Sequence, residues 1–292
     1  MLEEKLRRRL ESLNRGPLPT PPAAIKAKRS PLRPGAVKSI GGLLKRATVV
    51  TNEVGEHGRI VLPLEELWPG GEELVARRHA HLSAQPFDQS REVAPAVREL
   101  RELTGAFPRE MLLMDLETCG LSGSPLFLVG LLRHVEGRLA VELLLARTYA
   151  EEHAVLASFW QRAAAHRVLV TFNGKSFDWP MVVDRSARYL IFRQAQLIES
   201  QPPESQPPEL LHVDLLHHSR RRWRRQLPDC RLQTLERHIC GRGRSGDIAG
   251  AQIPAAYQEF VRTGFDRDMD AILLHNAIDL VTLLDLAMRL AR

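Results

Sequence analysis

Cysteine is scarce in this chain, with only three among 292 residues: Cys119, Cys230 and Cys240. They form no CxxC pair and show no regular metal-ligand spacing, which argues against a structural zinc site and against a disulfide framework. We therefore expect three reduced, partly buried thiols.

Long apolar runs are missing as well. No run is long enough to span a bilayer, so we expect no membrane partner. The first residues, MLEEKLRRRLESLNRG, are charged throughout and lack the apolar centre of a signal peptide, which favours a cytoplasmic location. Hydrophobic residues make up 44% of the chain, enough for the core of one large domain or two small ones.

The chain has a modest excess of basic charge. It contains 41 Lys and Arg against 35 Asp and Glu, a formal net charge of +6. This excess favours a polyanionic partner such as nucleic acid. A solvated basic surface with no such partner explains it equally well.

Composition divides the chain into segments. Residues 1–38 are basic and rich in proline, which predicts a disordered or extended segment. Residues 39–87 contain short apolar runs separated by glycines and predict a small N-terminal extension with a few strands. The tandem repeat ESQPPESQPPE at 199–209 predicts an exposed insertion, which we interpret as a linker rather than a recognition motif.

Residues 88–292 show regular hydrophobic periodicity. Three strand patterns, EMLLMDLET, PLFLVGLLRHV and RLAVELLLART, are followed by a helix pattern and a further strand, RVLVTFNG. Further helices are predicted over the last 60 or so residues, and the longest closes the chain. This order predicts an α/β domain with a mixed sheet flanked by helices.

Acidic residues occur where these elements end. Asp115 and Glu117 alternate along the first strand and therefore share a face, although like charges repel. Asp178 follows the strand VLVTFNG where a helix should begin, and Asp279 lies in the final helix. His275, four residues before Asp279, shares its helical face.

Four carboxylates meeting from these elements would form an oxygen-rich site for hard cations such as Mg²⁺ or Mn²⁺. A pair of such ions can bind a phosphodiester, activate water and stabilise the leaving oxygen. The neutralising ions would also explain why Asp115 and Glu117 can stand side by side. Each carboxylate alone could instead cap a helix or end a strand, but their joint occurrence is poorly explained in that way.

Three short motifs resemble a known family. DLET, FNGKSFD and HNAID are similar to the exonuclease motifs of the DEDD (DnaQ-like) superfamily of RNase H-like 3′→5′ exonucleases. The stretch LQTLERHICGRGRSGDIAGAQIPAAYQEFVRTGFDRDMDAILLHNAIDLVTLL resembles the YprB-type branch of RNase H-like domains. The resemblance covers roughly residues 88–292 and predicts an RNase H-like exonuclease domain there.

The resemblance implies specific roles for the acidic residues. Asp115, Glu117, Asp178 and Asp279 would bind two Mg²⁺ or Mn²⁺ ions, and His275 would be the general base. HNAID places three residues between His and Asp, as in tyrosine-type members, whereas many histidine-type members place four. The implied substrate is single-stranded DNA or RNA, and a helicase or other nucleic-acid-processing protein is an implied partner.

Four further residues are candidates for binding substrate, each with a simpler alternative. Asn173 could position substrate or end a strand in an Asn-Gly turn. Thr118 could bond a substrate oxygen or serve as a strand-end hydroxyl, and Leu121 could stack on a terminal base or belong to the core. Trp223, within RRRWRR, could stack a base while the arginines hold phosphates, although charge runs are often solvated helix faces.

Two other carboxylates stand outside this set of four, and only Asp247 is assigned no catalytic role. Asp214 could be an additional acidic residue near the site or a satisfied turn residue. Asp247 is interpreted as a helix N-cap or a loop brace.

The function predicted from these residues is a metal-dependent nuclease, foremost a 3′→5′ exonuclease. Two alternatives remain open: a non-catalytic nucleic-acid-binding module that keeps the fold, and a structure-selective endonuclease that uses the same ions. Retained binding in EDTA without turnover would identify the first, and cleavage of a circular substrate would identify the second.

Overall fold

The computed structural model describes residues 40–84, 94–120, 123–194, 209–244 and 247–291. The predicted disordered segment 1–38 lies outside these residues, as does the proline-rich insertion except for Glu209.

A seven-stranded mixed sheet forms the centre of the protein, in the order β1-β2-β5-β4-β3-β6-β7. The first five strands in this order pair antiparallel, and β6 and β7 continue the sheet parallel to β3. This arrangement confirms the predicted α/β fold with a mixed sheet. The strands are β1 (Thr48–Asn52), β2 (Gly55–Pro63), β3 (Met111–Thr118), β4 (Leu126–Val135), β5 (Arg138–Leu145), β6 (Val168–Thr171) and β7 (Leu211–Asp214).

The predicted N-terminal extension joins this sheet, because β2 pairs with β5 from Gly58 to Pro63. Its second half differs from the expectation. Within this segment, for which the sequence predicts a few strands, the structure also has the helices α2 (Leu64–Leu67) and α3 (Gly71–Ser83). Apolar runs as short as those of α3 do not distinguish a strand from a helix, and α3 buries only Gly71 and Val75.

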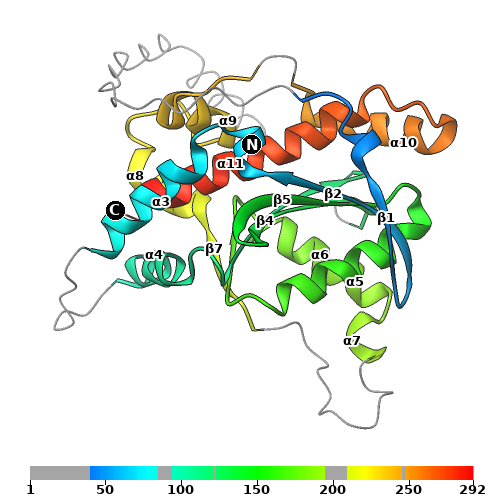
Figure 1. The fold of residues 1–292 in the computed structure, drawn as a ribbon, viewed down its shortest axis with the longest axis horizontal. Helices are drawn as coiled ribbons and strands as arrows, with labels where there is room; N and C mark the ends of the chain where they lie inside the picture. The colour runs from blue at the N-terminus through cyan, green and yellow to red at the C-terminus, as the bar shows by residue number, and fades with distance from the viewer. Residues whose placement is uncertain (1–39, 85–93, 121–122, 195–208, 245–246, 292) are drawn as a thin grey trace, which may run out of the picture.

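Helices cover both faces of the sheet (Figure 1). The long helix α11 crosses β3, β4 and β5 on one face, and α5 and α6 lie on the other. After α3, the helices are α4 (Pro95–Ala106), α5 (Glu152–Ala163), α6 (Asp178–Arg188), α7 (Ile191–Gln194), α8 (Leu215–Trp223), α9 (Leu232–Leu235), α10 (Ile253–Thr263) and α11 (Met269–Leu290). Short 3₁₀ turns occur at η1 (Leu44–Arg46), η2 (Tyr149–Glu151) and η5 (Gly250–Gln252), and a π-helical segment at η4 (Glu236–Cys240).

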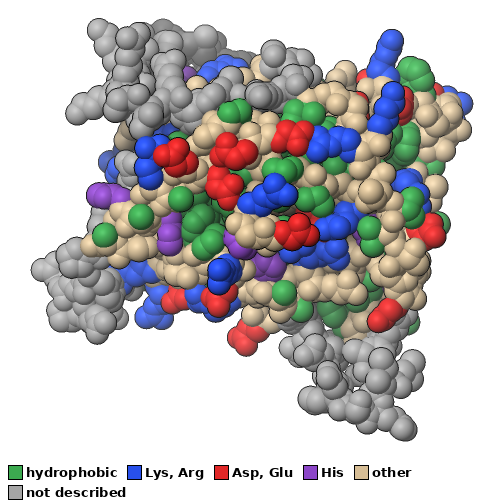
Figure 2. All heavy atoms as spheres, in the orientation of Figure 1, with side chains coloured by type: hydrophobic (Ala, Val, Ile, Leu, Met, Phe, Trp, Pro, Cys, Tyr) green, Lys and Arg blue, Asp and Glu red, His purple; other side chains and the backbone are tan. Residues whose placement is uncertain are grey.

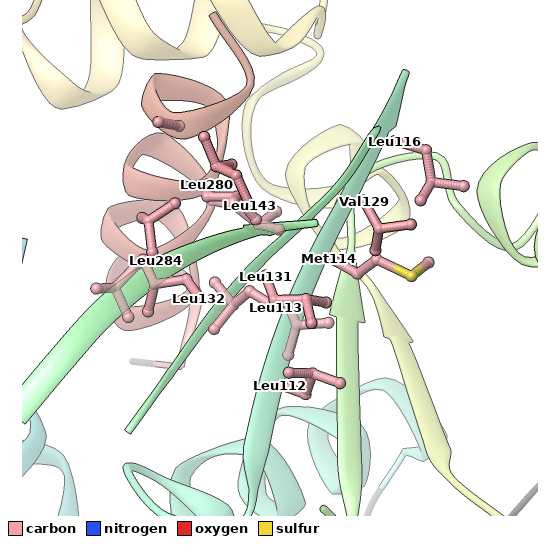
Figure 3. Close-up of a cluster of buried hydrophobic side chains, with 14 of the residues drawn as sticks. Leu112, Leu113, Met114, Leu116, Val129, Leu131, Leu132, Leu143, Leu280 and Leu284 are labelled. Carbon is pink, nitrogen blue, oxygen red and sulfur yellow. The ribbon is translucent and has the colours of Figure 1, made fainter. Parts of the chain in front are cut away.

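One part of the hydrophobic core lies between α11 and the central strands. Leu280 and Leu284 of α11 pack with Leu132 and Leu143 of β4 and β5, and all four side chains are fully buried (Figure 3). By length and composition α11 could cross a membrane, but 78% of its apolar window is buried inside the protein. It therefore serves here as the central core helix, and its position fixes the residues that it carries against β3.

On the surface, charges of both signs are mixed. Figure 2 shows basic and acidic side chains interspersed with hydrophobic ones over the face turned to the viewer. The excess of positive charge therefore does not form one continuous basic surface on that face. Any basic binding surface there would be a smaller patch.

Candidate metal and nucleic-acid site

The first two carboxylates, Asp115 and Glu117, lie near the C-terminal end of β3. Asp115 pairs in register with Gly130 of β4, and the register shifts between Glu117 and Thr118. Such an irregularity redirects side chains at the end of a strand. Four fully buried residues, Met111–Met114, precede Asp115 and hold this part of the strand in the core.

The third carboxylate, Asp178, begins α6 and is only 6% exposed. The loop before it is held by Asp214, which accepts hydrogen bonds from the backbone N–H groups of Asn173 (2.8 Å) and Lys175 (3.2 Å). Asp214 also accepts from the N–H of Leu216 at 3.0 Å and so caps α8. Asp214 is therefore a buried brace that sets where Asp178 stands.

Helix α11 brings the fourth carboxylate and the histidine to β3. His275 and Asp279 share one face of the helix, as their spacing predicts, with Nε2 of His275 3.4 Å from Oδ2 of Asp279. Between them Asn276 donates a hydrogen bond of 2.8 Å from Nδ2 to Oδ2 of Asp115. This bond joins α11 to β3 at the site.

A glycine permits this close approach. A Cβ at position 130 would lie 1.7 Å from Oδ1 of Asn276, far inside contact distance. Gly130 stands opposite Asp115 in the sheet, so the missing side chain leaves room for Asn276 directly beside that carboxylate. Gly130 is thus part of the construction of the site.

The carboxylates lie close enough for the charge of one to raise the pKa of another. Loss of contact with water raises the pKa of Asp115 well above its usual value, and the charges of Asp279, Glu117 and Asp178 raise it further. Loss of contact with water likewise raises the pKa of Glu117 to about 8. For Asp178 the same cause, with the charge of Asp214, gives a pKa of about 7. A positive charge between these groups would relieve the repulsion.

One positive charge of the chain itself reaches the site. The guanidinium of Arg244 forms a short ion pair with Asp279, and its Nε lies 2.6 Å from Oε2 of Glu236. It also lies 3.5 Å from Oδ2 of Asp247. Arg244 therefore balances the charge of Asp279 through its Oδ1.

His275 is oriented by a second carboxylate. Its Nδ1 lies 2.7 Å from Oδ1 of Asp247, which leaves Nε2 turned toward Asp279. Burial disfavours the protonated imidazole, but the charges of Asp279 and Glu117 and the bond to Asp247 outweigh that effect and raise the pKa of His275. The carboxylate holds the ring in one orientation, as acidic partners of functional histidines commonly do.

The donor chemistry of the site fits a divalent cation. Four carboxylates supply the oxygen ligands that Mg²⁺ and Mn²⁺ prefer. Burial is the main cause that raises the pKa values of Asp115, Glu117 and Asp178, and repulsion between carboxylates adds to it for Asp115 and Glu117, so a cation would offset both effects. Among the described residues no three His, Cys, Asp or Glu side chains already stand in a ligating group. One oxygen of Asp279 is instead engaged by the guanidinium of Arg244.

The four residues predicted to bind substrate differ in their exposure and in their contacts. Thr118 donates a 2.7 Å hydrogen bond to the carbonyl of Gly120, so its hydroxyl serves the turn after β3. Asn173 is exposed with a φ of 66°, the left-handed turn conformation that asparagine tolerates. Leu121 lies outside the described residues.

The interpretation of Trp223 as a base-stacking residue is wrong in this structure. Its side chain is only 8% exposed and packs in the hydrophobic core with Leu227. Leu215, Ser219 and Trp223 are spaced by four along α8 and are all buried, so they form the inner face of that helix. The arginines around Trp223 stay on the surface.

Sequence reasoning missed Asn276 and Arg244 at this site, and it named Asp247 without relating it to His275. Asn276 carried a signal, because it is a polar residue inside an apolar helix, between His275 and Asp279. Arg244 and Asp247 come from the segment between η4 and η5, and no periodic pattern could relate them to α11. Their role follows only from the tertiary contacts.

Comparison with known proteins agrees with this architecture. The chain is 32% identical over 181 residues to a protein of Bacillus subtilis (strain 168) named "Uncharacterized protein YprB". The match covers 61% of this chain and 41% of that protein, so the chain spans less than half the length of this relative. A family model described as RNase_H superfamily matches residues 112–291, the part of the chain that carries the four carboxylates. The chain therefore belongs to the RNase H superfamily.

Proposed function

We propose that the protein is a metal-dependent nuclease, and that it removes nucleotides from the 3′ end of single-stranded DNA or RNA. One observation carries the proposal: Asp115, Glu117, Asp178 and Asp279 come together beside His275 in a chain of the RNase H superfamily. A superfamily of this kind points to nucleic acid as the substrate class and to divalent metal as the cofactor class.

The four carboxylates would hold Mg²⁺ or Mn²⁺, and we propose two ions. Bound there, the metal would supply charge to the phosphodiester oxygens and lower the pKa of water. For Oδ1 of Asp279 to bind metal, it has to be released from Arg244. Glu236 and Asp247 would keep Arg244 close when that happens, because they contact Nε and Nη1 of its guanidinium, whereas Asp279 contacts Nη2.

The chain's own residues would then direct the hydrolysis. Water attacks the terminal phosphorus and gives its proton to Nε2 of His275, while Asp247 fixes the ring through Nδ1. The bond from phosphorus to the 3′ oxygen of the preceding nucleotide breaks, and that oxygen takes up a proton. The products are a nucleoside 5′-monophosphate and a strand that is one nucleotide shorter.

The experiment uses a linear and a circular single strand of the same sequence, as DNA and as RNA. Each is incubated with the full chain in Mg²⁺, Mn²⁺ or EDTA. We expect metal-dependent release of nucleoside 5′-monophosphates from the linear strand and an intact circle. Cleavage of the circle would show that the protein is an endonuclease rather than an exonuclease. No cleavage with either metal would refute the proposal that it is a nuclease.

The ion pair of Arg244 with Asp279 favours one other function, a module that binds nucleic acid without cutting it. In such a protein the guanidinium would be the permanent counter-ion of the site. Binding of the linear strand that is equally tight in EDTA and in Mn²⁺, with no product in either, would establish that function.

A further inference from the structure

We propose that the arginines of residues 220–225 form a second nucleic-acid site, which holds the phosphate backbone of a single strand. The inference rests on the proposed function in that it takes nucleic acid as the ligand. These residues line a cleft of about 370 Å³ at the C-terminal end of α8, and its described lining consists of Arg220, Arg221, Arg222, Arg224, Arg225 and Gln226. We call it the arginine cleft.

The arginine cleft carries charge that the described residues do not balance. All five guanidinium-bearing side chains are exposed, and none forms an ion pair or a side-chain hydrogen bond with a described residue. Several arginines elsewhere are paired, for example Arg185 with Glu152 and Arg244 with Glu236. Five like charges within six residues repel one another, and a polyanion lying across them would remove that repulsion.

The cleft is also rigid, which distinguishes it from a flexible basic tail. Trp223 lies within the run and is anchored in the core, so the arginines on both sides have a fixed base. The turn after the helix is held by hydrogen bonds from the N–H groups of Gln226 (2.8 Å) and Leu227 (3.1 Å) to the carbonyl of Trp223. Because the backbone is already held, only the arginine side chains have to be ordered when their guanidinium groups meet phosphate oxygens two at a time.

The length of α8 suits one continuous strand. Helix α8 begins after Asp214, the residue that braces the loop before Asp178, and it packs against α11. From Asp214 to Arg224 the helix rises by about 15 Å at 1.5 Å per residue. At about 3.4 Å per stacked nucleotide this corresponds to roughly four nucleotides. A strand with its 3′ end at the carboxylates could therefore reach the cleft with the nucleotides behind it.

The test measures binding of a fluorescein-labelled single strand of about 20 nucleotides in EDTA, by fluorescence anisotropy over a series of salt concentrations. The variant Arg224→Gln with Arg225→Gln removes two charges just beyond α8. The matched control is Arg109→Gln with Arg138→Gln, because both are exposed arginines without an ion-pair partner among the described residues. Thermal unfolding of each variant checks that it is folded.

Each phosphate contact to a single strand contributes about 0.7 to the slope of log affinity against log salt. We expect that slope to fall by about 1.4 in the cleft variant and to stay unchanged in the control. Equal slopes for wild type, variant and control would overturn the inference. If the wild type cleaves nothing but the slopes differ, the nuclease fails while the arginine cleft stands; if it cleaves and the slopes are equal, only the cleft fails.

Discussion

Nδ2 of Asn276 on α11 donates a 2.8 Å hydrogen bond to Asp115 on β3, while Oδ1 of the same amide lies where a Cβ at position 130 would stand. Asn276 thus holds the carboxylate of Asp115 in place, and the absence of a side chain at Gly130 leaves room for this contact. Oδ1 of Asn276 is buried without a hydrogen-bond partner among the described residues, so the donor side of the amide alone sets its orientation.

This relationship predicts a large effect of a small change. Gly130→Ala would place its methyl group on Asn276, and we expect a loss of about 1–3 kcal/mol in the free energy of unfolding. The cleavage rate should fall as well, because Asp115 loses its orienting bond. Urea unfolding and single-turnover cleavage measure the two effects.

Gly105→Ala provides the control for that substitution. A Cβ there lies no closer than 3.7 Å to Arg167, and the position is within α4. Alanine should leave the cleavage rate unchanged and stabilise the helix by roughly 0.5–1 kcal/mol. Equal unfolding free energies for the two variants would contradict the packing described for Gly130.

The raised carboxyl pKa values predict how the metal-free protein responds to pH. Glu117 titrates near pH 4.5 when unfolded and near 8 when folded, so the folded state binds the extra proton between these values. The stability that this proton contributes is present below about pH 4.5 and is lost as the pH rises through about 8. Asp178, with a pKa of about 7, acts in the same direction.

We therefore expect the unfolding free energy in EDTA to fall between pH 5 and pH 8, on the order of a few kcal/mol. Glu117→Gln should flatten this dependence, whereas Asp184→Asn, at an exposed carboxylate paired with Arg188, should not. Urea unfolding at several pH values decides the matter. A wild-type curve that rises over this range would mean that the carboxylates are not crowded.

Arg244 and a metal ion compete for Asp279 in this account. Arg244→Gln should tighten Mn²⁺ binding by about tenfold, on the order of 1.4 kcal/mol, measured by isothermal titration calorimetry. Arg237→Gln is the control, since Arg237 is exposed and lines the same cleft beside the site as Arg244. Weaker Mn²⁺ binding in the Arg244 variant would show that the guanidinium supports the metal site rather than competing with it.

Asp247 is expected to act through His275. Asp247→Ala should lower the cleavage rate by about 10- to 100-fold, because the imidazole loses the partner that orients it. Gln233→Ala removes a different neighbour of Asp247, at 3.2 Å, and leaves the bond to His275 in place. Equal single-turnover rates for the two variants would exclude the orienting role, and recovery of activity in Asp247→Glu would support it.

The sequence predicts much of the fold because several elements have strong local patterns. The strands β3 to β6 and the helix α11 are nearly continuous apolar or regularly periodic segments, and each was expected where it lies. The strand β7 and the helix α8 were not expected. The strand has only four residues, and the helix is dominated by histidine and arginine, although its buried positions recur every four residues.

The site is predictable to a lesser degree. The acidic residues follow strands or share helix faces, so their proximity could be inferred from pattern and topology. The partners could not: Arg244 lies 35 residues before Asp279, and Asp247 lies 28 residues before His275. Contacts of this kind depend on how a loop without periodicity crosses α11, which only the folded structure supplies.

The most direct test of the account is a time course with a 5′-labelled single strand in Mg²⁺, Mn²⁺ or EDTA, comparing wild type with Asp115→Asn and with the control Asp184→Asn. We predict a metal-dependent ladder that shortens from the 3′ end for the wild type and the control, and no ladder for Asp115→Asn. A ladder of equal rate from Asp115→Asn, or a wild type that binds the strand in EDTA and never cuts it in metal, would contradict the claim that these carboxylates form a catalytic metal site.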